Sequence, residues 1–472
     1  MPDRLSALDV SFLYLEEPTT PLHVGSVALF DDGELNYETL LTLVRERLAY
    51  VPRYRQRVRW VPAHLANPVW VDDDDFDLTY HVRRSALPKP GTPDQLRELV
   101  ARLMSRPLDR SRPLWEMYLV EGLAGGKFAL VSKTHQAVVD GISTVDIGQV
   151  VLDPSPEPPP APSDVWSPVS EPSSLELVVG AVSEAIRRPS AMLDTARSTL
   201  SDVTFTTGRV VDVLGEAAGG LARALRLARP APGSPLNVPI GAQRRFATVD
   251  TKLDDYRDVR AQFGGSVNDV VLATITGALR TWLFTRGIPV RAATTVRALV
   301  PMRIQDGPDD EASGPRGVGS RVAEYVVDLP IGEPSPAMRL HQVSYAMKAH
   351  SETGQAVGAR VASSLSRRTF NLVVTNVPGP QNPLYSAGAV MQASYPYVPL
   401  AKGQALAIGL TSYNGRVCFG LNGDRDAMAD LSVLAASLPE ALAELEEAVR
   451  PQRARKNVAA ATRKRTVRKR AR

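Results

Sequence analysis

Hydrophobic residues in the first 152 positions follow the periods of strands and helices in turn. The apolar runs in Val24–Phe30 and Lys127–His135 predict strands, and the spacing of apolar residues in Tyr37–Leu48 and Pro93–Met104 predicts helices. This alternation predicts a mixed α/β half over residues 1–152.

A proline-rich segment and a helical segment follow this first half. Eight of the 20 residues from Asp153 to Pro172 are proline, which predicts a semi-rigid exposed linker because such a segment cannot build a packed core. From Leu175 to Arg229, apolar residues spaced three and four apart, such as Leu175, Val178, Val179 and Val182, predict an amphipathic helical stretch. Residues 153–235 are therefore expected to be a connector.

A second α/β half is expected over residues 236–450, closing with a helix over Leu431–Val449. The last segment, residues 451–472, holds ten Lys or Arg and no acid, so its removal changes the remaining formal charge from +4 to −6. This composition predicts a solvated, disordered tail. The same charge density would also attract the protein to anionic lipid, at about 1 kcal/mol per basic residue, or non-specifically to nucleic acid.

Composition is typical of a large globular protein. The chain has 472 residues, of which 44% are hydrophobic and 22% charged, and no apolar run approaches the length that crosses a bilayer. The first residues lack a basic-then-apolar leader, and the one cysteine, Cys418, permits no internal disulfide and is expected to be buried. These features predict a cytoplasmic protein.

One short segment carries candidate catalytic chemistry. Residues His135–Gly141 have the sequence HQAVVDG, which is similar to the HHxxxDG signature of a superfamily of acyl-CoA-dependent acyltransferases. In that signature the second histidine and the aspartate act together to take a proton from an acceptor hydroxyl, so that its oxygen attacks a thioester. Here His135, Asp140 and Gly141 match, but the second histidine is replaced by Gln136.

The replacement at Gln136 removes the natural general base. Imidazole titrates near neutral pH, with an unperturbed pKa of about 6.5, whereas a glutamine amide does not titrate. The amide can still orient a hydroxyl or donate a hydrogen bond to a developing oxyanion. Losing a positioned base costs about 10²–10⁴ in rate, roughly 3–5 kcal/mol of barrier, so the sequence is compatible with a weakened enzyme.

Two roles remain open for His135. Neighbouring side chains on a strand point to opposite faces, so only one of His135 and Gln136 faces a given cavity if the strand continues through both. His135 is then either a substitute base, which needs a local twist or bulge, or a buried and hydrogen-bonded support. Asp140 is correspondingly an orienting partner or a turn former.

Five further blocks resemble the bacterial wax ester synthase/diacylglycerol acyltransferases, especially the mycobacterial and actinobacterial members, along nearly the whole chain. The blocks are Arg4–Tyr14 with Pro21–Gly25, Pro113–Glu116, Ser266–Ala273, Thr375–Pro380 and Ser412–Gly415. Trp115 also suits a packing anchor, and Asn268 and Asp269 suit residues that cap a helix N-terminus. Asn376 lies in a turn that could present backbone amides to a ligand. The residues carried over as motif and structural support are Gly141, Pro113, Leu114, Trp115, Asn268, Asp269, Asn376, Pro378 and Gly379.

The resemblance implies two chloramphenicol acetyltransferase-like halves with a channel between them. It also implies an acyl-CoA-dependent O-acyltransferase that makes triacylglycerol from diacylglycerol, or wax esters from long-chain alcohols, with His135, Gln136 and Asp140 as catalytic candidates. Acyl-CoA is then a co-substrate, and no metal or redox cofactor is implied. Because these acceptors partition into membranes, peripheral contact with an anionic membrane or lipid droplet is expected, and specific nucleic-acid binding is not. The alternative is a catalytically weak paralogue that binds acyl-CoA or lipid for storage, transport or regulation.

Overall fold

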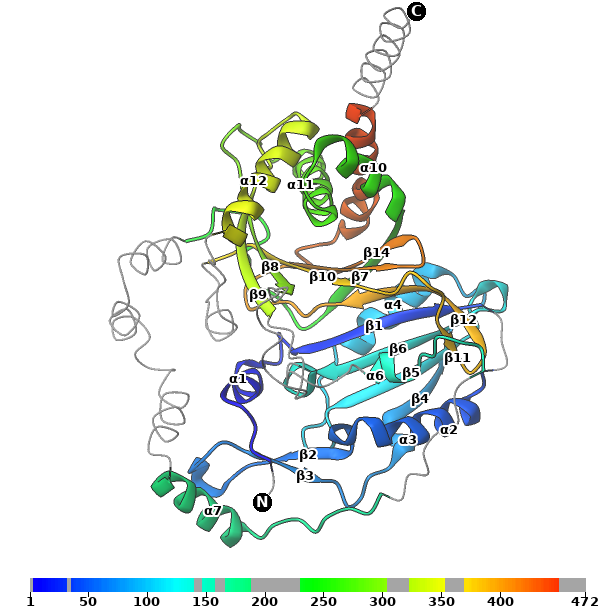
Figure 1. The fold of residues 1–472 in the computed structure, drawn as a ribbon, viewed down its shortest axis with the longest axis vertical. Helices are drawn as coiled ribbons and strands as arrows, with labels where there is room; N and C mark the ends of the chain where they lie inside the picture. The colour runs from blue at the N-terminus through cyan, green and yellow to red at the C-terminus, as the bar shows by residue number, and fades with distance from the viewer. Residues whose placement is uncertain are drawn as a thin grey trace, which may run out of the picture.

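Two six-stranded sheets lie one above the other in the computed structural model, with helices around them (Figure 1). The structure describes residues 3–31, 35–139, 147–157, 166–187, 230–303, 322–352 and 369–449. The predicted catalytic residue Asp140 and its neighbour Gly141 lie outside these ranges, as do residues 188–229 of the predicted helical stretch and the tail over 451–472.

The first sheet has the strand order β11-β12-β1-β6-β5-β4. Only β4 and β5 pair in parallel; the other neighbours are antiparallel. Its strands are β1 (His23–Phe30), β4 (Val82–Ala86), β5 (Trp115–Glu121), β6 (Phe128–His135), β11 (Tyr385–Ser386) and β12 (Ala389–Tyr397). A separate hairpin pairs β2 (Gln56–Arg59) with β3 (Val69–Asp72).

Helices of the first half cover the two faces of this sheet. On one face a core cluster includes α2 (Tyr37–Arg47), and on the other face α4 (Pro93–Met104) packs between the first sheet and β7 (Arg244–Lys252). The remaining helices are α1 (Ala7–Leu15), η1 (Leu48–Tyr50), η2 (Pro52–Arg55), η3 (Pro62–His64), α3 (Leu78–His81), η4 (Ala124–Gly126), α5 (Gln136–Val139), α6 (Ile147–Val150) and α7 (Ser174–Arg187).

The second sheet has the strand order β7-β14-β13-β10-β8-β9. Its strands are β7 (Arg244–Lys252), β8 (Val296–Arg303), β9 (Val322–Leu329), β10 (Leu372–Pro378), β13 (Leu406–Tyr413) and β14 (Arg416–Asp424). The largest hydrophobic cluster joins this sheet to α10 (Leu253–Phe263), α11 (Val267–Thr285), α12 (Pro336–Glu352) and the helical residues 431–449. Figure 1 shows these helices together on the side of the sheet that faces away from the first half.

Chain segments cross between the halves, which the sequence pattern did not predict. Strands β11 and β12 come from the second half of the chain, yet β12 pairs with β1 in the first sheet. At this crossing the backbone of Gly420 in β14 lies very close to that of Pro396 in β12. A Cβ built on Gly420 would lie 2.0 Å from the carbonyl oxygen of Pro396, so only glycine fits there. Across the same junction the Tyr395 hydroxyl donates a hydrogen bond of 2.7 Å to Asp250. Strand β12 is therefore paired within the first sheet and also contacts β13 and β14 of the second sheet.

Strongly periodic elements form at the predicted places. Helix α4 spans the predicted Pro93–Met104, because Thr92 and Gln95 form a capping box at its start and proline suits its first turn. Helical residues 431–449 also match the prediction. Cys418 is buried without a disulfide partner, and burial raises the pKa of its thiol to about 12.

Most described residues of the predicted exposed linker are exposed, as expected, but both of its ends also contact the first half. Asp153 is buried and forms an ion pair of 2.7 Å with Arg47. Near the other end, the carboxylate of Glu171 contacts both Arg57 and Arg59. Charged side chains therefore tie both ends of this proline-rich segment to the body of the protein.

The predicted helical stretch is only partly buried where the structure describes it. Among the described side chains of α7, Leu177 is buried and packs with Val61 and Val69, Val178 is half-buried, and Leu175 and Val179 are exposed. The spacing correctly indicated a helix over the described part, Ser174–Arg187. None of the helices in the described ranges is both long and apolar enough to cross a membrane.

Candidate active site

The HHxxxDG-like motif begins where a strand turns directly into a helix. His135 is the last residue of β6, and Gln136 is the first residue of α5. The His135 amide donates a hydrogen bond to the carbonyl oxygen of Leu114, and the Gln136 amide donates one to that of Leu22, both at 2.9 Å. Backbone hydrogen bonds from two different family blocks thus fix this junction.

The side chain of His135 points into the protein. It is only 1% exposed, and its Nδ1 accepts a hydrogen bond of 3.0 Å from the amide of Ala137. An accepting Nδ1 leaves the proton of the neutral ring on Nε2. That Nε2 lies 3.6 Å from Oε2 of Glu16, a buried carboxylate. Both ring nitrogens are therefore turned toward protein groups, and this arrangement favours the support role over the substitute-base role.

Glu16 is the centre of a buried polar cluster. Besides His135, its carboxylate contacts Nε2 of His23 at 3.3 Å and accepts hydrogen bonds of 2.6 and 3.1 Å from Arg110. The amide of Leu22 donates to the same carboxylate at 3.3 Å. Burial alone would raise the pKa of Glu16, but its contacts with His135, His23 and Arg110 outweigh burial and hold this pKa well below its usual range. Glu16 is therefore ionised.

His23 completes the cluster from the neighbouring strand. It lies opposite His135 in the antiparallel register of β1 and β6, and the two ring centroids are 6.2 Å apart. Burial lowers the pKa of His23 to about 4, although the contact with Glu16 opposes the shift. The cluster therefore holds one negative carboxylate, one neutral histidine in His23 and the cation of Arg110.

Gln136 differs from His135 in its surroundings. Its side chain is half-buried, and the short helix that it begins packs against α1. Gln136 begins this helix, whereas His135 ends the strand. Of the two adjacent motif residues, Gln136 is therefore the one with access to solvent.

The family block Pro113–Glu116 supports this junction by packing and by a backbone hydrogen bond. Trp115 is fully buried, donates a hydrogen bond of 2.7 Å from Nε1 to the carbonyl oxygen of Tyr54, and stacks on His81 with ring centroids 4.7 Å apart. Leu114 is also buried and supplies the carbonyl oxygen that receives the His135 amide. The block, which begins at Pro113, thus acts by packing and by holding backbone, as a large buried aromatic typically does.

Asn268 and Asp269, in the family block Ser266–Ala273, have different partners. Asp269 belongs to a capping box, in which it accepts a hydrogen bond of 2.8 Å from the amide of Ser266, the residue that caps α11. Asn268 does not take part in this cap; its Oδ1 accepts a hydrogen bond of 3.1 Å from Nδ2 of Asn376. The structure therefore joins two blocks that lie 108 residues apart in the sequence.

In the turn after β10, a backbone amide is bonded within the protein. The amide of Gly379 donates a hydrogen bond of 3.0 Å to the carbonyl oxygen of Ser412, so this amide is not available to a ligand. A Cβ at Gly379 would lie 2.6 Å from that oxygen, which explains why glycine stands there. Pro378 ends the strand and has no amide hydrogen to donate. The turn thus couples two family blocks, at Thr375–Pro380 and Ser412–Gly415.

Sequence reasoning missed Glu16 and Arg110 and assigned no role to His23. Glu16 lies between the two parts of the N-terminal family block, immediately after an apolar helix, and this position was the one available signal. The pairing with Arg110 spans 94 residues and depends on tertiary structure. Although the cluster contains ligand types that metals use, no group of three His, Cys, Asp or Glu among the described residues is arranged to hold a metal ion.

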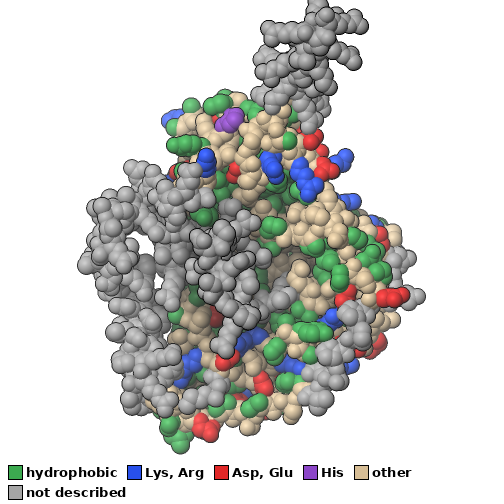
Figure 2. Space-filling view, viewed as in Figure 1, with side chains coloured by type: hydrophobic (Ala, Val, Ile, Leu, Met, Phe, Trp, Pro, Cys, Tyr) green, Lys and Arg blue, Asp and Glu red, His purple; other side chains and the backbone are tan. Residues whose placement is uncertain are grey.

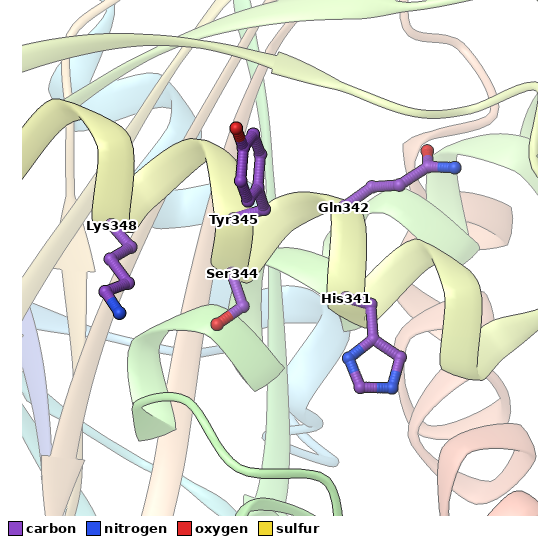
Figure 3. Close-up of a pocket in the computed structure, with 5 residues that line it drawn as sticks. All are labelled: His341, Gln342, Ser344, Tyr345 and Lys348. Carbon is purple, nitrogen blue, oxygen red and sulfur yellow. The ribbon is translucent and has the colours of Figure 1, made fainter.

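A surface hollow of about 480 Å³ lies elsewhere, along α12. It is lined by His341, Gln342, Ser344, Tyr345 and Lys348. Figure 3 shows that Tyr345 and Gln342 project from one side of the helix, whereas His341, Ser344 and Lys348 project from the other. These side chains do not converge on one point, so the hollow offers no set of groups comparable to the cluster around Glu16.

Comparison with known proteins decides the family. The model of the wax ester synthase/diacylglycerol acyltransferase catalytic domain matches residues 5–271, and that of the C-terminal domain of the same family matches residues 351–446. The chain belongs to this family. A probable diacylglycerol O-acyltransferase of Mycobacterium tuberculosis, tgs2, is 34% identical over 95% of this chain and 99% of its own length. Another from that organism, tgs3, is 46% identical over 56% of this chain and 97% of its own length.

A solved structure supports the same assignment. The wax ester synthase/diacylglycerol acyltransferase of Marinobacter aquaeolei is 29% identical, covers 94% of this chain and 99% of its own, and superposes with a TM-score of 0.67. The predicted family and the predicted two-part α/β architecture are therefore confirmed. The protein is an acyl-CoA-dependent acyltransferase of the wax ester synthase/diacylglycerol acyltransferase family in which Gln136 replaces the second motif histidine.

Proposed function

We propose that this acyltransferase joins a fatty acyl group from acyl-CoA to the hydroxyl of a diacylglycerol or long-chain alcohol, without a histidine at the position of the base. One observation carries the proposal: Nδ1 of His135 accepts from Ala137, and Nε2 faces Glu16. His135 is therefore a fixed support, and Gln136 is the motif side chain left to meet the acceptor.

In the proposed reaction every bond and proton is accounted for without a titrating base. The acceptor oxygen attacks the thioester carbonyl, the carbon–sulfur bond breaks, and the hydroxyl proton passes to the departing CoA sulfur directly or through water. The products are an ester and free CoA. The amide of Gln136 orients the acceptor hydroxyl or donates to the developing oxyanion. Because no base takes the proton early, turnover is expected to be about 10²–10⁴ below that of a member with the full motif.

Three further parts of the proposal come from the family and the sequence. Acyl-CoA is a co-substrate, and the transfer chemistry requires no metal or redox cofactor. The channel that brings the two substrates together lies between the halves, near the end of β6. The protein contacts an anionic membrane or lipid droplet peripherally, because its acceptors are insoluble in water and its last 22 residues carry ten positive charges.

A second candidate function is favoured by the same substitution. With Gln136 in place of the base, the protein would be a weak paralogue that binds acyl-CoA or lipid for storage, transport or regulation. Such a role keeps the binding surfaces and loses only the proton transfer. The two candidates differ in a measurable quantity, which is ester formed per acyl-CoA bound.

The deciding experiment uses purified full-length protein, labelled acyl-CoA and a panel of diacylglycerols and long-chain alcohols, with acyl-CoA hydrolysis measured alongside transfer. We expect slow ester formation above the protein-free background, with a preference among acceptors. Saturable acyl-CoA binding with no ester from any acceptor would favour the paralogue instead. A Gln136→Ala variant is the matched control, because it leaves the backbone hydrogen bond from residue 136 to Leu22 in place and removes the side-chain amide that orients the acceptor.

A further inference from the structure

The guanidinium of Arg244 is buried at the junction of the two halves. Figure 2 shows Lys and Arg side chains at the surface of both halves, which is their usual place, whereas the side chain of Arg244 is only 1% exposed. Arg244 is the first residue of β7, and α4 of the first half packs against this strand. A buried cation needs partners that compensate for its lost hydration, so the partners of Arg244 indicate what this residue does.

The partners of Arg244 lie on both sides of this junction. Within the second half, its Nη1 donates hydrogen bonds to the carbonyl oxygens of Gly241, at 2.6 Å, and Gln243, at 3.0 Å. The same nitrogen lies 4.0 Å from the carboxylate of Asp424. In the first half, the carbonyl oxygen of Thr19 accepts a hydrogen bond from Nη2. The rigid fork of an arginine presents several donors at once, so this one side chain ties the two halves together.

The carbonyl group that Arg244 holds in the first half lies in the middle of residues 16–22, which we call the site turn. At the start of the site turn, the carboxylate of Glu16 faces Nε2 of His135. At its end, the carbonyl oxygen of Leu22 accepts the hydrogen bond from the backbone amide of the next motif residue at 2.9 Å. The site turn therefore contacts both adjacent motif residues, and a shift of this turn would move both of these contacts.

A second contact of Arg244 reaches the segment that holds Glu16 from its other side. The backbone amide of Arg244 donates a hydrogen bond of 3.1 Å to the hydroxyl of Ser105, the residue that follows α4. Further along the same segment, Arg110 donates a hydrogen bond of 2.6 Å to the carboxylate of Glu16. Arg244 thus contacts, from the second half, both of the first-half segments that meet at Glu16.

We infer that Arg244 is a positioning residue for acyl transfer, which holds the site turn from the second half and, through Glu16, sets the orientation of the motif. It touches no reacting group itself. The inference rests on the proposed function, in which His135 is a fixed support and Gln136 orients the acceptor. The relative position of the two halves thereby determines where the supports of the motif lie.

A double-mutant cycle separates this role from stabilisation of the junction alone. It compares kcat for the full-length wild type, Arg244→Met, Glu16→Gln and the double variant, at a temperature where circular dichroism shows all four to be folded. If Arg244 acts through Glu16, its replacement lowers kcat in the wild type and adds little once Glu16 has been changed. The matched control is Arg339→Met, because Arg339 is also a second-half arginine with a side chain only 2% exposed, and it is bonded to Glu444 of the same half.

We expect Arg244→Met to lower kcat by about 10- to 100-fold, because a misplacement of about 1 Å can cost about 10²-fold in rate. In the Glu16→Gln background the same change should alter kcat by less than about twofold. Equal factors in the two backgrounds would overturn the inference, as would an equal loss of kcat in Arg339→Met. Should Arg244→Met not fold, Arg244→Lys, which keeps the buried charge but lacks the fork, replaces it in the same cycle and is expected to show the same pattern with a smaller loss.

Hydrogen exchange, measured without any substrate, keeps this inference distinct from the proposed function. The amides of Leu22 and Gln136 are bonded to Glu16 and to Leu22, so their exchange reports on the order of the site turn and of the motif. We expect Arg244→Met to speed this exchange by about tenfold and Arg339→Met to leave it unchanged. Unchanged exchange in Arg244→Met would overturn the inference. If no protein forms ester, the proposed function fails, yet the exchange still decides whether Arg244 holds the site turn.

Discussion

Glu16 and His135 form a buried pair in which Oε2 of the carboxylate faces Nε2 of the imidazole at 3.6 Å. The other ring nitrogen of His135 is held by the amide of Ala137. This pair favours a support role for the surviving motif histidine. The imidazole is oriented from both sides, so its geometry supports the neighbouring residue and does not reach toward an acceptor.

Replacing Gln136 by histidine should raise acyl transfer. The change places a titrating imidazole where the family has its base, and the gain is expected to approach the lower part of the 10²–10⁴ range. Steady-state kinetics with acyl-CoA and the preferred acceptor would measure it, with Gln136→Asn as the control for altered side-chain shape. Unchanged turnover, with folding and acyl-CoA binding intact, would show that the site lacks more than a base.

Replacing His135 by alanine should lower stability and activity together. The change leaves the Ala137 amide and one side of Glu16 without a buried partner, at a cost of about 1–3 kcal/mol in the free energy of unfolding. Denaturant unfolding and kcat, measured on the same preparation, would test this. A loss of kcat at unchanged stability would instead place His135 in the chemistry.

Asp140→Asn, made in parallel, addresses the remaining predicted catalytic residue. It should mainly disturb orientation and local folding of the motif, so we expect kcat to fall. Wild-type kcat in this variant would remove Asp140 from the candidates.

Replacing Glu16 by glutamine should destabilise the junction at the end of β6. The carboxylate is the common partner of two histidines and Arg110, and we expect a loss of roughly 1–3 kcal/mol, moderated because Arg110 is partly exposed and can turn to solvent. The matched control is Glu17→Gln, which removes an exposed ion pair with Lys402 and should cost less than about 1 kcal/mol. Equal effects of the two changes on the unfolding midpoint would contradict the central role of Glu16.

Acidification should destabilise the protein through His23. Its pKa is lowered to about 4 in the folded chain, compared with about 6.5 when unfolded, so between these values the unfolded state binds the additional proton. The free energy of unfolding should therefore fall as the pH decreases from about 6.5 to about 4. In His23→Asn this fall should be shallower, with a residual slope from His81, whose pKa burial also lowers to about 4.

Unfolding curves across this pH range would provide the comparison, with His64→Asn as the control at an exposed histidine. The pH slope is the informative quantity, because any change at buried His23 also lowers the absolute stability. A slope identical to that of the wild type would show that His23 titrates normally in the folded protein.

The sequence by itself determined the elements that depend on local signals. Helix α4 follows from its capping residues and proline, and strands β1 and β6 follow from short apolar runs. The family blocks also predicted the enzyme class, and the loss of the base at Gln136 is visible directly in the motif. Each of these signals lies within a short stretch of chain, where the conformational propensities of the residues and the spacing of apolar residues determine the local structure.

Only the tertiary structure decided which distant residues meet. The exchange of β12 into the first sheet, the bond between Asn268 and Asn376, and the outward side of α7 all depend on contacts across many positions. The same is true of the site, because the carboxylate that fixes His135 comes from Glu16, more than one hundred residues earlier in the chain. Hydrophobic periodicity shows which side of an element is apolar, but it does not show what that side contacts, since the partner is set by packing of the whole chain.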